Sequence, residues 1–233
     1  MSTRALRLRR VTPQAAGLLG VAALAWLATL IQARDMGVMP GTMGMGLAAF
    51  VVMWTPMMAA MMLPAVATLA SMYVRSLRVR RTLRLGAFAG CYLLVWAGAG
   101  VPAFALAWLA GRVADGHPTA ATAAASATFA ACGVDQLSPL KRRCLKHCRS
   151  PLALLLRYGS YRGALRHLRA GAHHGAYCLG SCWSLLALLV AFGVMNVAAM
   201  ITLAAVVIVE KLWSRGEAFS GVWAWWPSHW RSR

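Results

Sequence analysis

The sequence predicts an all-α protein, a polytopic bundle of about six transmembrane helices, from its composition, its apolar stretches and the placement of its charges. Of 233 residues, 60% are hydrophobic and 12% are charged, which is typical of a protein that resides in lipid. The 24 Lys and Arg residues outnumber the 5 Asp and Glu residues, but they lie in short blocks between apolar stretches. A nucleic-acid-binding protein would gather them on one folded face. We therefore expect the lipid bilayer, and no nucleic acid, as a partner.

The predicted spans follow from length, because a helix needs about 20 apolar residues to cross a hydrocarbon core of about 30 Å. The last apolar stretch, 175–213, is too long for one span. Gly193 and Asn196 supply the turn chemistry that divides it. The predicted spans are 15–32, 46–73, 85–110, 119–137, 175–193 and 196–213, which make one membrane domain over 15–213.

Both termini are predicted to be cytoplasmic, because short cytoplasmic loops collect Lys and Arg. With this arrangement of spans, every basic residue except Arg34 and Arg112 falls on the cytoplasmic side. The segments outside the spans include a basic N-terminus over 1–14, a basic cytoplasmic loop over 138–174 and a Trp-rich tail over 214–233.

The predicted topology separates the 6 cysteines into those inside spans and those near the cytoplasmic face. Cys91 and Cys132 fall inside spans, where a thiol is most simply a small apolar packing group. In the reducing cytosol, cysteine pairs are more often metal-binding or redox-active than disulfide-bonded. The other cysteines form two Cys-x-x-x-Cys pairs near the cytoplasmic face, Cys144 with Cys148 in the basic loop and Cys178 with Cys182 at the start of the fifth span.

The spacing of each pair places both thiols on one side of a helix, so that each pair can offer two sulfurs to one ion. His174 extends the second pair by one further turn. Neighbouring Lys and Arg residues favour the thiolate, which is the form that binds metal. Metal binding is the favoured hypothesis, with thiol redox chemistry and inert packing as alternatives. The candidate ligands at this face are Cys144, Cys148, Cys178, Cys182 and His174.

Methionine is the second unusual feature, since most of the 13 methionines lie between residues 36 and 62. A helix over 53–62 presents a thioether face, because its methionines fall on two adjoining stripes. Thioethers bind soft ions, chiefly Cu(I), without deprotonation, although methionine also fills irregular gaps between helices. The candidate ligands in this span are Met53, Met57, Met58, Met61 and Met62.

Further methionines punctuate a Gly-rich loop on the predicted outside, at Met36, Met39, Met43 and Met45. Methionine thioethers outside and within a span, together with cysteine thiols at the cytoplasmic face, would form a series of sites that hold or pass a soft ion across the membrane. Copper, as Cu(I), explains both kinds of sulfur. Zinc is the less favoured ion, because thioethers contribute little to a zinc site.

Ordered motifs carry a resemblance to a known family: MWTPMMAAMMLP (53–64), LKRRCLKHCRSP (140–151), HGAYCLGSCW (174–183), GVMN (193–196) and Glu210-Lys211. From about residue 36 to 211, the chain resembles a bacterial family defined by a domain of unknown function. Its members are described as predicted metal-binding integral membrane proteins and sometimes as copper chaperones.

The resemblance implies metal handling in the bacterial inner (cytoplasmic) membrane, with the four paired cysteines at matching positions and His174 beside them. One departure is visible, because Gly180-Ser181-Cys182-Trp183 stands where the family usually has Gly-Cys-Cys-Trp. We expect Ser181 to lie on a different helical face from the cysteines, so that its lack of sulfur leaves a site intact.

The leading hypothesis is a multi-pass membrane protein that binds Cu(I) and passes it between sites or to a protein that donates or accepts the metal. No catalytic constellation is recognised. No Gly-x-x-x-x-Gly-Lys-Ser/Thr loop occurs in the sequence, which argues against an ATP-driven pump and against an enzyme. The alternatives are a membrane thiol-disulfide oxidoreductase and a non-catalytic structural subunit of a membrane complex.

Overall fold

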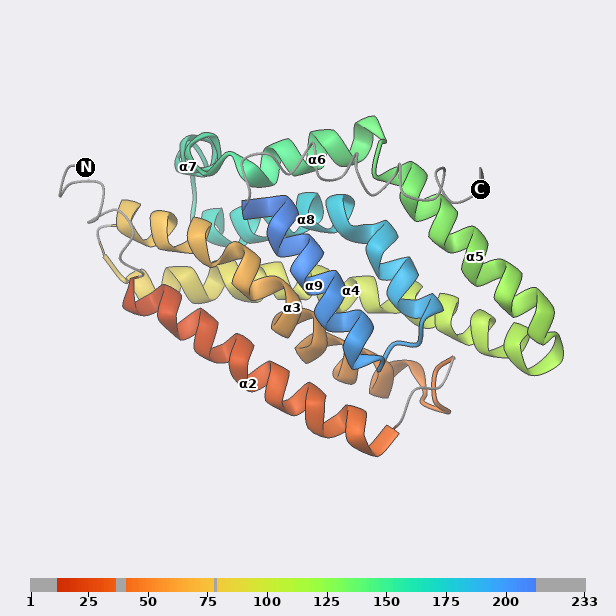
Figure 1. The fold of residues 1–233 in the computed structure, drawn as a ribbon. Coiled ribbons are helices and arrows are strands. Elements are labelled where there is room, and N and C mark those ends of the chain that lie inside the picture. The colour runs from red at the N-terminus through yellow and green to blue at the C-terminus, as the bar shows by residue number, and fades with distance from the viewer. Residues whose placement is uncertain (1–11, 37–40, 78, 213–233) are drawn as a thin grey trace, which may run out of the picture.

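The computed structural model describes residues 12–36, 41–77 and 79–212 (Figure 1). These residues form helices and no strand, which confirms the all-α prediction for this part of the chain. The Trp-rich tail, Met39 and most of the predicted N-terminal segment lie outside the described residues. The helices are α2 (Pro13–Met36), α3 (Leu47–Ser76), α4 (Arg81–Gly116), α5 (Pro118–Asp135), α6 (Pro139–Arg149), α7 (Pro151–Gly159), α8 (Arg166–Ala191) and α9 (Val197–Leu212).

Within the described ranges, 4 helices are long and apolar enough to cross a membrane, namely α2, α3, α4 and α8. They contain the first, second, third and fifth of the predicted spans. The predicted span 119–137 forms α5, which has 18 residues and is rich in Ala, Thr and Ser. The span 196–213 forms α9, whose described part has 16 residues. Neither meets the same criterion of length and apolarity, so the number of six and the cytoplasmic termini remain predictions.

The predicted basic loop over 138–174 is largely helical. It contains α6, α7 and the first turns of α8. The helix that carries the predicted fifth span therefore begins at Arg166, before the first residue of that span, Gly175. Local signals explain α6. The Ser138 hydroxyl accepts a hydrogen bond from the Lys141 amide at 3.0 Å, and Pro139 occupies the first turn, where its missing amide is harmless.

The helix break predicted at 193–196 is confirmed. Helix α8 ends at Ala191, and Gly193 has a φ of +93°, a left-handed conformation that favours glycine. The Asn196 side chain then accepts a hydrogen bond from the Ala199 amide at 3.1 Å. Asn196 thereby caps the start of α9.

The long helices α3, α4 and α8 form the centre of the bundle (Figure 1). Helix α2 packs on α3 at one flank, whereas α5, α6 and α7 lie at the opposite flank and α6 runs along α8. Inside, the indole of Trp54 donates to the carbonyl of Trp96 at 3.0 Å and joins α3 to α4. This arrangement brings α6, α8 and α9 together at the place where the paired cysteines lie.

Candidate metal site

Glycines let α8 approach α4 closely. A Cβ on Gly171 would overlap the backbone of Phe88, and one on Gly175 would lie 3.0 Å from the Cβ of Val95. Small residues at four-residue spacing permit such close crossings between helices in membranes. Cys178 follows on the buried side of the same helix, so its thiol directly meets side chains of α4.

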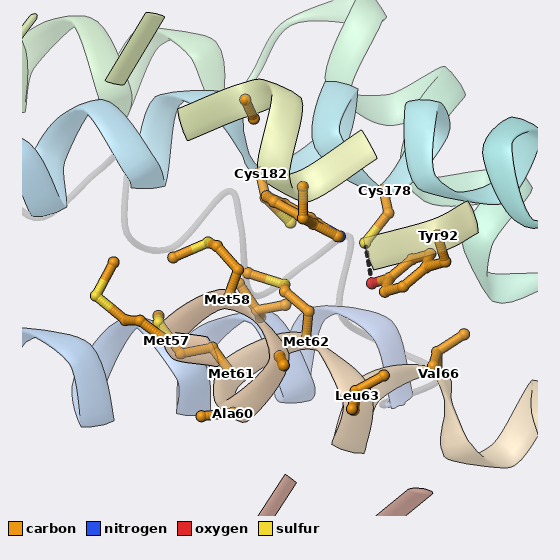
Figure 2. Close-up of a cluster of buried hydrophobic side chains, with 14 of the residues drawn as sticks. Met57, Met58, Ala60, Met61, Met62, Leu63, Val66, Tyr92, Cys178 and Cys182 are labelled. Carbon is orange, nitrogen blue, oxygen red and sulfur yellow. Dashed lines mark hydrogen bonds between the residues drawn. The ribbon is translucent and has the colours of Figure 1, made fainter. Parts of the chain in front are cut away.

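The Cys178 sulfur has two polar partners and the residue is only 1% exposed. The Tyr92 hydroxyl of α4 lies 3.0 Å from this sulfur (Figure 2). The Lys211 ammonium of α9 lies 2.7 Å from it, and an ammonium group can only donate. A positively charged donor beside a sulfur favours the thiolate, which is the form that binds a soft metal.

Cys182 lies one turn further along α8 and is fully buried. Ser181 is buried as well. Its hydroxyl donates to the Cys178 carbonyl at 2.8 Å and lies 3.5 Å from the Cys182 sulfur. The Ser181 side chain therefore folds back along its own helix and also contacts the cysteine that follows it.

Helix α6 places its cysteines against α8. The Cys144 sulfur lies 2.9 Å from the position that a Cβ on Gly180 would occupy. Burial raises the pKa of the Cys144 thiol, and the neighbouring Cys182 raises it further. Burial raises the pKa of Cys148 to about 11, and Cys182 again contributes. Cys144 thus packs against α8 at Gly180, and Cys148 of α6 lines the same cavity as Cys178 of α8.

A cavity of about 150 Å³ opens where α3, α4, α6, α8 and α9 meet. One water occupies about 30 Å³ of liquid, so there is room for an ion and a few small ligands. Apolar residues of α3 complete the wall. The lining comprises Ala65, Val66, Thr68, Leu69, Tyr92, Cys148, Arg149, His174, Cys178, Lys211 and Leu212.

His174 contributes an imidazole to this wall. Its ring stacks on Tyr92 with a centroid distance of 5.8 Å and lies 6.0 Å from the ring of Phe88. The Nδ1 atom is buried and has no hydrogen-bond partner among the described residues. Buried polar atoms are normally paired, so this nitrogen is a candidate ligand for something that enters the cavity.

The predicted methionine face lies in the same interior as the α8 cysteines. All five methionines of 53–62 are buried on α3, in one apolar cluster with Cys178 and Cys182. In Figure 2, Met58 and Met62 point from α3 toward the side of α8 that carries these cysteines. The α3 wall of the cavity is formed by residues that follow Met62, and none of the five methionines belongs to the lining.

Buried polar contacts hold the helices around the thiols. The Lys141 ammonium of α6 lies 3.1 Å from the Glu210 carboxylate of α9, and their side chains are 1% and 3% exposed. The Asp135 carboxylate at the end of α5 accepts a hydrogen bond from Ser184 of α8 at 2.7 Å. Partnered charges of this kind persist in a low-dielectric interior. They join α6 to α9 and α5 to α8.

The described residues contain no group of three or more His, Cys, Asp or Glu side chains arranged to hold a metal ion. The structure instead has the two α8 thiols on one helix, Cys148 of α6 in the same cavity wall as Cys178, and the thioethers of α3 in the same apolar cluster as the α8 cysteines. Thiolate and thioether ligands select soft ions such as Cu(I). The chemistry of this donor set therefore fits copper, although no coordination sphere is assembled.

Sequence reasoning missed Tyr92 and did not assign a role to Lys211, both of which contact Cys178. The signal for Lys211 was present, because Glu210-Lys211 is a charged pair in an otherwise apolar stretch, and intramembrane charges are normally partnered. Tyr92 gave no comparable signal, since a single tyrosine in an apolar helix has many packing roles.

The fold and site define a helical protein with membrane-length apolar helices and a buried cavity whose lining includes two cysteines, a histidine and a lysine. The sequence matches the PpoB2 family, described as a copper chaperone, over residues 51–229. This match covers most of the chain, so the protein belongs to the PpoB2 copper chaperone family, and the resemblance noted in the sequence is confirmed. No curated protein and no solved structure matches the chain.

Proposed function

We propose that this protein binds Cu(I) as cargo at the α8 thiols of Cys178 and Cys182 and transfers it to or from a partner protein at the cytoplasmic face of the bacterial inner membrane. The observation that carries the proposal is the contact of the Cys178 sulfur with the Lys211 ammonium at 2.7 Å. That contact prepares a buried sulfur to receive a soft cation. Membership of a copper chaperone family supports the choice of metal.

In this proposal, the α6 thiols are the exchange partners of the α8 thiols. Cys148 is partly exposed and lines the cavity together with Cys178, whereas Cys182 is fully buried. An ion that arrives at Cys148 would therefore move inward by exchanging one sulfur for the next. His174 and the methionines of α3 supply neutral donors beside this route, which suits Cu(I) better than Zn(II).

The test is anaerobic Cu(I) binding to reduced, detergent-purified protein, measured by competition with a chromophoric Cu(I) chelator. Replacing both Cys178 and Cys182 by Ser should abolish tight binding. Replacing Cys144 and Cys148 should weaken binding or slow transfer to a chelator. The matched control replaces Cys91 and Cys132, and it should bind copper as the parent protein does. Unchanged Cu(I) affinity in the Cys178/Cys182 variant would overturn the proposal.

The methionines have a separate test. Replacing Met58 and Met62 together by Leu keeps side-chain volume nearly constant and removes only the thioethers. If these sulfurs are ligands, Cu(I) should dissociate faster while the melting temperature stays close to that of the parent protein. Equal dissociation rates in the two proteins would assign the methionines to packing alone.

The second candidate function is thiol-disulfide exchange, which is favoured by the position of Cys148 of α6 and Cys178 of α8 in the wall of one cavity. All six cysteines are free in the structure. An oxidoreductase would cycle these thiols through a disulfide that connects α6 and α8. Mass spectrometry of alkylated protein after exposure to an oxidised dithiol would detect this disulfide, whereas a copper carrier would keep its thiols reduced and be protected from alkylation by Cu(I).

A further inference from the structure

The positive charge of Lys211 lies beside the cysteine cavity and is not neutralised by the adjacent carboxylate of Glu210. Its ammonium points at the Cys178 sulfur. Its chain neighbour Glu210 gives no compensation, because that carboxylate is paired with Lys141 at 3.1 Å. The other charged residue of the cavity lining is Arg149, which is also positive. The two charged residues of the described cavity lining are therefore both positive, and that lining contains no carboxylate.

Among the residues that the structure describes, the remaining nearby carboxylate belongs to Asp135, and it is engaged elsewhere. It accepts hydrogen bonds from Ser184 at 2.7 Å and from Ser138 at 3.1 Å. Tyr92 and His174 complete the polar surroundings of the cavity and are neutral in their ordinary forms. Of the two cations in the lining, Lys211 is the one in contact with the Cys178 sulfur, so it is the cation nearest to a metal held by that thiolate.

Geometry places a metal on Cys178 close to this cation. A metal–sulfur bond is about 2.3 Å long, and the ammonium lies 2.7 Å from the sulfur, so the ion would sit within about 5 Å of the nitrogen. Cu(I) with two thiolates carries one net negative charge, which Lys211 neutralises. Zn(II) with the same thiolates is neutral, so Lys211 would leave one uncompensated positive charge in a buried site. Such a charge is unfavourable in a low-dielectric interior.

We infer that Lys211 makes the cysteine cavity selective for soft monovalent cations over divalent cations by fixing one positive charge beside Cys178. This inference rests on the proposed binding of metal at the α8 thiols and adds the class of ion that the site accepts. Lys211 acts here as a specificity-determining residue and is not a ligand. Lys211 also stabilises the thiolates in the metal-free site. That effect is the same for every metal, so it cancels in the ratio of two metal affinities.

The experiment compares Cu(I) with Zn(II), which have the same electron configuration and differ by one charge. Affinities are measured by competition with chromophoric chelators on reduced protein, anaerobically, for the parent chain and for Lys211→Met. At about 5 Å and an effective dielectric constant of about 20, removal of the cation should raise the ratio of Zn(II) affinity to Cu(I) affinity by roughly 100-fold. Ag(I) and Cd(II) form a second pair with equal electron configuration and should shift in the same direction.

Two matched variants serve as controls. Lys211→Arg keeps the charge and should leave the ratio within about threefold of the parent value. Lys146→Met removes an equal charge from an exposed position on α6, where solvent screens it, and it should also leave the ratio unchanged. If Lys211→Met does not purify as folded protein, Lys211→Gln removes the same charge, keeps a hydrogen-bond donor and carries the same expectation.

The outcomes separate the inference from the function on which it rests. A parent protein that binds Cu(I) through Cys178 and Cys182, with the same ion ratio in the parent, Lys211→Met and Lys211→Gln, overturns the inference alone. A ratio that shifts equally in Lys146→Met also overturns it, because the effect would then be one of overall charge. A parent protein in which the cysteines bind no Cu(I) overturns the proposed function together with the inference.

Discussion

At the scale of single residues, the position of the Cys144 sulfur depends on a missing side chain. Gly180 of α8 leaves the space that this sulfur occupies, since a Cβ there would come within 2.9 Å of it. The obstructed atom is the end of a short side chain and not backbone, so the cysteine can rotate away without moving a helix. An alanine at this position would therefore change the thiol site more than it changes the fold.

Replacing Gly180 by Ala should lower Cu(I) affinity by about 10- to 100-fold, as other changes beside metal ligands do. The free energy of unfolding should change little, because the helix propensity gained by alanine, about 1 kcal/mol, offsets the new contact. Chelator competition and thermal melting in detergent measure the two effects. The control is Gly90→Ala on α4, where nothing lies within 4 Å of an added Cβ. An equal loss of copper affinity in the control would contradict this explanation.

At the scale of helices, the buried pair of Lys141 and Glu210 ties α6 to α9. Replacing Lys141 by Met leaves a buried carboxylate without a partner. The free energy of unfolding should then fall by about 3–5 kcal/mol, whereas the double variant with Glu210→Leu should recover much of the loss. Urea or SDS unfolding of the single and double variants checks this. Two single losses that simply add in the double variant would mean that the pair does not interact.

The helices themselves were largely predictable, because apolar stretches of membrane length are visible in any single sequence. The break at Gly193 and Asn196 was predictable for the same local reason. A helix around Cys144 and Cys148 was assumed from their spacing, but the bounds of α6 within the basic segment were not predicted. The capping signal of Ser138 followed by Pro139 was present and would have located its start.

The site was predictable only in part. Spacing indicated that the thiols of each pair share one helix side, but the position of Cys148 and Cys178 in the wall of one cavity depends on how α6 packs against α8. The contacts of Cys178 join it to residues far away in sequence, Tyr92 on α4 and Lys211 on α9. Contacts at such separations are set by tertiary packing, and no local pattern in the chain encodes them.

At the scale of the whole molecule, the open question is whether α5 and α9 cross the membrane with the four longer helices. The two arrangements differ in the side on which α6 and α7 lie. With six spans, their basic residues are cytoplasmic, as the distribution of Lys and Arg favours. With α2, α3, α4 and α8 alone, the same basic helices would follow an odd number of crossings and lie outside.

Labelling with a membrane-impermeant maleimide in intact cells distinguishes these arrangements. A cysteine introduced at Gly116, the last residue of α4, should react from the outside in either case. A cysteine introduced at Ser160, after α7, should react only after permeabilisation if the six-span prediction is correct. Both positions are exposed, and the parent protein gives the background from its own thiols. Reaction at Ser160 in intact cells would contradict the prediction and favour four spans.

The prolines of α3 have a consequence for what holds the methionine segment in shape. Pro56 and Pro64 both lie inside the helix, and a proline has no amide hydrogen to donate. The carbonyls four residues earlier, at Val52 and Ala60, therefore lack the usual donor within the helix. The turns between the two prolines are joined to the rest of α3 by fewer backbone bonds than in a regular helix. The geometry of these turns therefore depends more on packing against the neighbouring helices than that of the other turns of α3 does.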